Sequence, residues 1–434
     1  MLRFALIPLA FAVTASHAAS PEALNLSKAY ALARERDAGF QASVAQLDAA
    51  REQLPQARAR QLPSVGLSSS RTRVQQDRQD EDRAFPSQTY VSEADAITLR
   101  QPIFNRRIDA TVRQAEQSGL AAEASLRRQQ GDLMVRVAEV YLGVLLAQER
   151  LTLVEAQQQS VQSRLQGARQ AVAAGTGIRT DVDELAAQSD LLNAQALSAR
   201  QAIQRARLDL ETVVGQPVGP LSRGLLARDQ LMRLADIAGL DHWLSQGLRH
   251  HPEIEARQNA LNAAQAALEA ARADRLPTVE LTAQVARSSS ENSFFVNSTT
   301  TNRTVGLQLT VPLYQGGAID SRERQAVAQV REAEAQLMVA QNRVRQAVQQ
   351  AYFAVRESVE RMEALEQAVQ SAAQVVVANE QSFKAGLRTT LDIVAAQQRE
   401  AQARLDLESA RLDLVMATVR LDASVGELGL RAGL

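Results

Sequence analysis

Apolar residues recur at every third or fourth position over long stretches of the chain. Between residues 344 and 365 they are Val344, Val348, Tyr352, Val355, Val359, Met362 and Leu365. This spacing puts them on one face of a helix and predicts a seam for neighbouring helices. A two-stranded filament could use the same seam.

Proline and glycine mark where these helices end. Residues 103–216 and 313–434 contain no proline, and Gly386 is the only glycine between Ala318 and Val425. Proline breaks helices and glycine often ends them, so we expect a helix from about Ala318 to Lys384, a turn at Gly386 and a second helix. At ~1.5 Å per residue the first helix would be ~100 Å long. This length predicts a rod.

A period of two residues occurs in shorter segments. Apolar residues alternate with polar ones in 279–285 and 305–313, and more weakly in 65–74 and 94–100. Alternation predicts strands, and about nine residues is the length that a tilted strand needs to cross a bilayer. We expect β-hairpins at about 64–101 and 278–314, with outer loops at 75–93 and 287–303. A soluble antiparallel sheet would give the same alternation.

The N-terminus has the pattern of a secretory signal. Arg3 precedes an apolar run from Phe4 to Val13, and the small residues Ser16 and Ala18 suit signal peptidase. We therefore expect residues 1–18 to be a signal peptide, with a core helix as the alternative. No later segment has the roughly 18 uncharged apolar residues that a transmembrane helix needs.

Composition excludes several kinds of chemistry. The chain has no cysteine, which excludes disulfides, zinc–thiolate sites and lipid attachment to an N-terminal cysteine. Its formal charge of −1 argues against binding to nucleic acid. His242, His250 and His251 lack the spacing of metal ligands, and Gly175-Thr176-Gly177 lacks the third glycine of a dinucleotide loop. We expect no metal, no cofactor and no catalytic residue.

The two halves of the chain repeat each other. Leu62-Pro63 matches Leu276-Pro277, and three pairs share one offset of 211 residues: Tyr141 with Tyr352, Gly175 with Gly386, and Asp181 with Asp392. We expect one repeat at 19–215 and a second at 244–426, each with a helix, a β-hairpin and a long helical hairpin. Four strands have open edges that a membrane does not tolerate, so the chain should form an oligomer.

Several motifs resemble the TolC family of outer-membrane factors. They are His251-Pro252-Glu253-Ile254-Glu255-Ala256, Ala271-Arg272-Ala273-Asp274-Arg275-Leu276-Pro277, Pro312-Leu313-Tyr314-Gln315-Gly316-Gly317 and Gly386-Leu387-Arg388-Thr389-Thr390-Leu391-Asp392. The resemblance covers essentially all of the mature chain. It implies a mainly α fold with a small β part: a homotrimer with a 12-stranded barrel in the lipid of the outer membrane of a Gram-negative bacterium, and a helical tunnel in the periplasm. Residues 216–243 and the tail 427–434 would form an equatorial region.

The resemblance also implies a function. The family's members are passive exit ducts, which dock onto a periplasmic adaptor and, through it, an inner-membrane ABC or RND transporter. This chain would serve type I protein secretion, small-molecule efflux or both, and the missing lipid-attachment cysteine favours secretion or a general-purpose duct. The alternative is a soluble periplasmic coiled-coil structural protein.

The resemblance places a gate at the tips of the helical hairpins. Asp392 matches a constriction acid of the family, whereas the second acid is Ala395 here, and Glu184 occupies the equivalent position of the first repeat. Closure in the family joins an Arg and a Tyr on one hairpin to a Thr-Asp pair on the other. Arg388, Thr180 and Asp181 match these residues, but the tyrosine is Phe383.

The turns themselves would contact the adaptor, through Gly175, Gly177, Gly386, Leu387 and Thr389. As an alternative, the charges at the tips are ordinary solvated side chains, because surface ion pairs contribute little stability.

Overall fold

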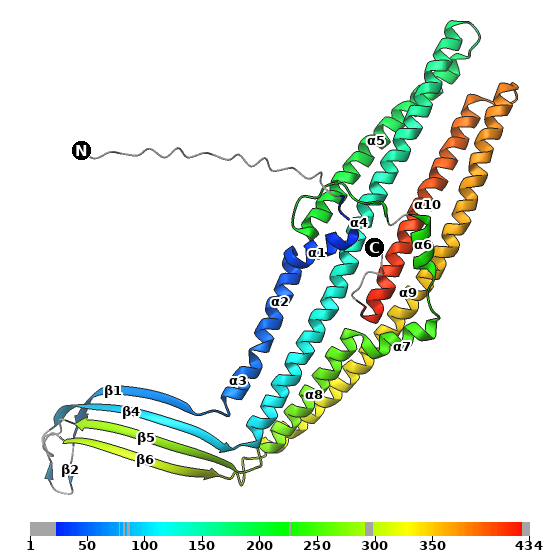
Figure 1. Cartoon of the computed structure of the whole chain (residues 1–434). Helices are drawn as coiled ribbons and strands as arrows, with labels where there is room; N and C mark the ends of the chain where they lie inside the picture. The colour runs from blue at the N-terminus through cyan, green and yellow to red at the C-terminus, as the bar shows by residue number, and fades with distance from the viewer. Residues whose placement is uncertain are drawn as a thin grey trace, which may run out of the picture.

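The protein is a long, curved rod of helices with a β-sheet at one end (Figure 1). The computed structural model describes residues 23–77, 79–80, 83–84, 87–224, 227–290 and 298–427. The signal peptide predicted at residues 1–18 lies outside the described residues, as does the predicted tail beyond Glu427.

The two halves share one order: short helices, a β-hairpin and a long helical hairpin. The first half has α1 (Leu26–Arg36), α2 (Ala38–Arg51), α3 (Gln53–Ala59), β1 (Ser64–Gln76), β4 (Gln88–Phe104), α4 (Arg106–Ala173) and α5 (Arg179–Val214), with the short strands β2 (Gln79–Asp80) and β3 (Arg83–Ala84) between β1 and β4. The second has α6 (Arg228–Ala235), α7 (Leu240–His250), α8 (Pro252–Ala273), β5 (Thr278–Ser290), β6 (Ser298–Thr310), α9 (Ala318–Lys384) and α10 (Thr390–Val425). α7, α8 and β5 begin at residues 240, 252 and 278, each 214 residues after α1, α2 and β1 at 26, 38 and 64.

The long helices have the bounds that the positions of proline and glycine predict. α9 runs from Ala318 to Lys384, as expected, and α4 has a similar length of 68 residues. Asn105 begins α4 by accepting a hydrogen bond from the backbone N–H of Arg107 at 3.1 Å. α4 packs against α5 and α8, while α9 packs against α10 and α8. The result is two antiparallel hairpins that lie side by side (Figure 1).

The main hydrophobic core lies at mid-length, where short helices pack on the long ones. It includes Leu26, Leu210 and Leu421, from three different helices. Tyr141 is fully buried there, and its hydroxyl lies 2.9 Å from the carbonyl oxygen of Leu24 and 2.8 Å from that of Ser222. Burial raises the pKa of Tyr141 to about 12. This tyrosine thereby ties the start of the described chain to the linker between the halves.

The predicted linker 216–243 ends inside a helix. Trp243 is 6% exposed and lies within α7, so this boundary falls inside Leu240–His250. His251 begins α8, because its Nδ1 accepts the backbone N–H of Glu253 at 3.1 Å. Burial lowers the pKa of His251, which favours the neutral ring that this cap requires.

The four-stranded sheet is antiparallel, in the order β1-β4-β5-β6. The strands are longer and the outer loops shorter than predicted, because polar segments remain paired: Ser288 lies opposite Thr300, and Arg73 opposite Val91. Hydroxyl side chains fit an exposed strand without giving an apolar alternation. The second hairpin, expected to reach residue 314, ends at Thr310. A bulge between Pro102 and Phe104 shifts the register of β4.

Candidate functional site

The two hairpin tips, at the end of the rod opposite the sheet, close with the same turn. Gly175 and Gly386 each follow the end of a long helix with φ of +74°, a conformation that favours glycine. After α4, the N–H of Thr176 donates to the carbonyl oxygen of Ala171 at 2.9 Å; after α9, the N–H of Leu387 donates to that of Ser382 at 2.9 Å. The predicted turn residues therefore occupy equivalent places in the two repeats.

The first tip is tighter than the second. A Cβ on Gly177 would lie 2.7 Å from the backbone nitrogen of Val172, closer than real Cβ contacts come. The equivalent residue of the second tip is Arg388, which is exposed. Only the first tip therefore requires a residue without a side chain at this position.

The helices that leave the tips start differently. Thr389 begins α10 with a capping box: its hydroxyl accepts the N–H of Asp392 at 3.3 Å, and the Asp392 carboxylate accepts the N–H of Thr389 at 2.9 Å. The equivalent residue before α5 is Ile178, whose side chain offers no cap. Asp181 is thus not used by a cap of its own helix, although it occupies the same place as Asp392.

Asp181 instead contacts the other hairpin. The hydroxyl of Thr390 donates to Oδ2 of Asp181 at 3.5 Å, in a partly buried setting. The sequence did not single out Thr390, because the hydroxyl equivalent to it in the first repeat is absent: that residue is Arg179. Its position in the first turn of α10, beside the cap, was the only available signal.

Arg388 and Asp392 form a pair within one hairpin. Nη1 of Arg388 lies 3.4 Å from Oδ1 of Asp392, and both side chains are substantially exposed. The N–H and hydroxyl of Thr389, and then Arg388, lower the pKa of Asp392. Among the described residues, no hydrogen bond joins Arg388 to Thr180 or Asp181, the partners that the resemblance implies. Thr180 is exposed at the start of α5.

Glu184 and Ala395 lie close together. Both line a small hollow of about 80 Å³ between α5 and α10, together with Asp181 and Thr390. The carboxylate of Glu184 is therefore beside the position of the missing acid. The hollow brings four residues of the candidate gate region into one place.

Apolar side chains are exposed at the tips. Phe383, at the end of α9, is 42% exposed, Leu391 54%, Ile178 65% and Leu387 78%. Their exposure in the single chain gives each tip an apolar surface among polar residues.

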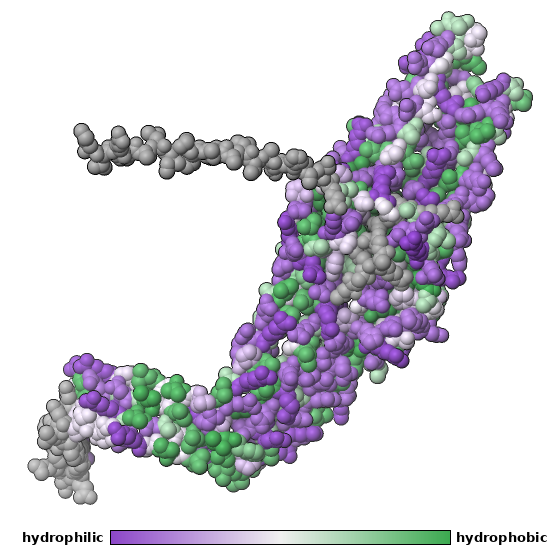
Figure 2. All heavy atoms as spheres, in the orientation of Figure 1, coloured by the Kyte–Doolittle hydropathy of each residue, from purple (hydrophilic) through white to green (hydrophobic). Residues whose placement is uncertain are grey.

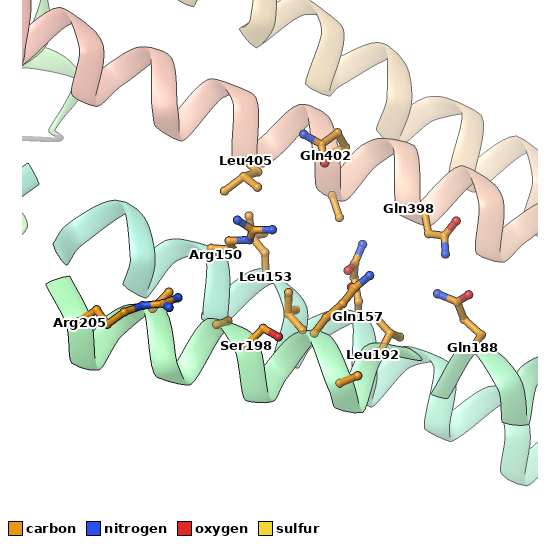
Figure 3. A pocket seen from close by; sticks show the side chains of 16 residues that line it. Arg150, Leu153, Gln157, Gln188, Leu192, Ser198, Arg205, Gln398, Gln402 and Leu405 are labelled. Atoms are coloured by element: carbon orange, nitrogen blue, oxygen red, sulfur yellow. The ribbon is translucent and has the colours of Figure 1, made fainter. Parts of the chain in front are cut away.

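A groove separates the hairpins farther from the tips. It has a volume of about 660 Å³ and is lined by α4, α5 and α10. Figure 3 shows Gln188 of α5 and Gln398 of α10 pointing toward each other across it. On the α9 side, Arg164 of α4 holds Glu380 at 2.7 Å, and the hydroxyl of Ser160 lies 3.1 Å from Oε1 of Gln397.

The sheet has two chemically different faces. The register places odd-numbered residues together, and these form an apolar face: Val65, Leu67, Ile97, Leu99, Leu281, Val285, Val305, Leu307 and Leu309. The bulge also pairs Phe104 with Val279, which brings this ring to the same face. Figure 2 shows hydrophobic residues gathered on the sheet between the helices and its far end. Exposure reaches 78% at Val305.

The even-numbered residues form a neutral face. Serine, threonine, glycine, alanine, asparagine and glutamine dominate it in all four strands. Within these strands its charged residues are Arg100 and Glu280, both at the end nearest the helices.

Within the described part of the chain, no helix is long and apolar enough to cross a membrane. No group of three or more His, Cys, Asp or Glu residues in that part could hold a metal ion.

Comparisons with known proteins agree with this architecture. Residues 29–216 and 243–427 match the outer membrane efflux protein family. The protease secretion protein PrtF of Dickeya chrysanthemi is 30% identical over 94% of this chain and 89% of its own length. The alkaline protease secretion protein AprF of Pseudomonas aeruginosa is 32% identical over 94% and 85%. The outer membrane protein TolC of Escherichia coli is 25% identical over 98% and 86%.

Solved structures show the same fold. A membrane protein from Pseudomonas aeruginosa gives a TM-score of 0.80 at 21% identity, covering 94% of this chain and 92% of its own. The outer membrane protein VceC of Vibrio cholerae gives 0.76 at 20% identity, covering 92% and 96%. The predicted fold class and resemblance are confirmed, and a soluble coiled-coil structural protein is not favoured. The chain belongs to the outer membrane efflux protein family and is an outer-membrane channel subunit with its helical tunnel in the periplasm.

Proposed function

We propose that three copies of this chain form one duct that carries secreted protein across the outer membrane. β1 and β6 are the outer strands of the sheet, so each has one edge that pairs with no other strand in the described part of the chain. Pairing β6 of one copy with β1 of the next closes the sheet, and three copies give a barrel of twelve strands. Its apolar face contacts lipid, and its neutral face lines a water-filled lumen.

The protease secretion relatives support a protein cargo. PrtF and AprF are 30% and 32% identical to this chain and span most of both chains. A small-molecule cargo is the second candidate, supported by the efflux protein BepC of Brucella suis, which is 26% identical over 76% of this chain. The family's members are channel proteins; the duct itself is passive, and an inner-membrane ABC transporter supplies the energy.

The tips close the duct and receive the periplasmic adaptor. Threefold symmetry would bring three copies of Asp181, Glu184 and Asp392 around one axis, where like charges repel and cations are favoured. Thr180, Phe383 and Arg388 complete the proposed gate. The exposed turns with Gly175, Gly177, Gly386, Leu387 and Thr389 form the adaptor contact, supported by the apolar surface there.

Complementation tests the cargo. In Dickeya chrysanthemi cells that lack PrtF, this chain should restore protease to the medium, with an empty vector as the negative control. In Brucella suis cells that lack BepC, it should restore resistance to exported compounds less completely than it restores protease release in the Dickeya cells. Rescue of resistance without rescue of protease release would replace protein secretion by small-molecule efflux.

A further inference from the structure

Charged residues on the apolar face of the sheet are confined to its far end. Within the four strands they are Arg71, Arg73, Glu93, Asp95, Arg287 and Arg303. Arg303 lies opposite Val285, in the last apolar row, and the other five lie beyond it, away from the helices. At the same level the neutral face has no charged residue. At this level the charged strand residues therefore all lie on the face that contacts lipid, and none of the strand residues on the lumen face is charged.

The carboxylates neutralise only part of this charge. Arg71 pairs with Glu93 at 3.2 Å, and Asp95 lies opposite Arg287 in the register. Four arginines against two carboxylates leave a net charge of +2 on this face in each copy. The Arg71 side chain is still 75% exposed although it is paired.

A neighbouring copy does not supply the missing negative charge. β1 and β6 would meet at the junction between copies, and neither strand has an acidic residue on this face. The junction instead brings Arg303 of one copy towards the side that holds Arg71 and Arg73 of the next. Positive charge that accumulates at the edge of an apolar surface attracts anions from the surroundings.

The height of this belt matches the edge of the membrane core. From Phe104 to Asp95, β4 covers roughly 30 Å along the strand, or about 23 Å of height at a tilt of ~40°. The apolar band of outer-membrane barrels is ~25 Å tall. The helices lie in the periplasm, so the arginines are at the outer surface, level with the headgroups of the outer leaflet.

We propose that Arg71, Arg287 and Arg303, with Arg73, form a binding site for the phosphate groups of a phosphorylated glycolipid in the outer leaflet. Guanidinium groups bind phosphate through paired hydrogen bonds, and the apolar rows beneath receive the acyl chains. The proposal rests on the outer-membrane location and is independent of the exported cargo.

Native mass spectrometry of the full-length oligomer in detergent tests the site, with bisphosphorylated lipid A as the probe and enzymatically dephosphorylated lipid A as its control. An arginine near an anionic lipid surface contributes about fivefold in affinity. The triple variant Arg71→Gln, Arg287→Gln, Arg303→Gln should therefore bind lipid A about a hundredfold more weakly. Binding of the dephosphorylated lipid should not change.

Two further variants separate charge from folding. Replacing the same three residues by lysine keeps the charge but loses the paired hydrogen bonds, so this variant should bind lipid A more tightly than the glutamine variant and more weakly than the wild type. The variant Arg169→Gln, Arg179→Gln, Arg399→Gln removes as many exposed arginines from the opposite end of the molecule and should bind like the wild type. A loss of less than tenfold in the sheet variant, or an equal loss for dephosphorylated lipid, overturns the proposal. Oligomer formation, followed in the same spectra, distinguishes this failure from failure of the duct to assemble.

Discussion

The contact between Thr390 and Asp181 makes a specific prediction about the gate. Thr390→Val replaces the hydroxyl by a methyl group of similar size and removes the 3.5 Å hydrogen bond that joins the two hairpins. A long, partly exposed hydrogen bond contributes about 0.5–1 kcal/mol. Three copies acting on one opening contribute about 1.5–3 kcal/mol, which raises the ratio of open to closed channels about 10- to 100-fold. Recordings of single channels in planar bilayers measure this ratio as the fraction of time that a channel is open.

Matched variants make the test sharp. Thr180→Val removes a hydroxyl of the proposed gate that is exposed, so it should raise conductance less than Thr390→Val does. Ile178→Thr supplies the cap that α5 lacks, so Asp181 should turn to its own helix, as Asp392 does, and the channel should open more often. An unchanged open fraction in Thr390→Val would refute the reasoning. If Thr390→Val left conductance unchanged while Thr180→Val raised it, the contact of Arg388 with Thr180 and Asp181 that the family resemblance implies would be the one that closes the gate.

Four other predictions concern single residues. Arg388→Ser should raise conductance, but less than Thr390→Val, because Arg388 pairs with Asp392 on its own hairpin; an equal or larger rise in the same bilayer assay would contradict this order. The lowered pKa of Asp392 means that its cap persists down through the ordinary pKa of 3.8 and is lost only in more acid solution, so hydrogen exchange at the start of α10 should accelerate only below that pH. Tyr141→Phe should reduce the free energy of unfolding by about 1–3 kcal/mol in denaturant titrations, because it removes the one O–H donor that the carbonyl oxygens of Leu24 and Ser222 share, and among the described residues only Leu24 keeps a second donor, the N–H of Ser222; in the wild type this contribution should be complete below pH 10 and be lost as the pH rises through about 12. Gly177→Ala should destabilise the first tip by about 1–3 kcal/mol, seen as faster hydrogen exchange, whereas Gly167→Ala, where the added Cβ has space, should not.

The long helices were predictable because their limits are set locally. Proline and glycine are absent from the interior of α9, and Gly386 stands where the backbone needs a positive φ. The strand ends were less predictable, since serine and threonine pair in a ladder without an apolar pattern. The bulge that returns Phe104 to the apolar face depends on pairing with Val279, which the sequence does not display.

The partners at the tips could be predicted only in part. Glu184 and Ala395 occupy equivalent positions of the two repeats, and they line the same hollow between α5 and α10. The hydrogen bonds between the hairpins could not be predicted from the repeat. Whether an aspartate at the tip can bond to the other hairpin depends on whether it already caps its own helix. Asp392 is engaged by Thr389, and Asp181 is available only because Ile178 cannot cap.

The neutral face of the sheet bears on how a polypeptide travels. Charged side chains of an extended polypeptide would bind to fixed charges of opposite sign on the wall. Each such ion pair would have to break before the polypeptide could move on. Beyond Arg100 and Glu280, the strands offer hydroxyl and amide groups, which exchange hydrogen bonds with water and cargo alike. In the proposed duct, such a surface gives cargo of either charge nearly the same energy at every step along the strands.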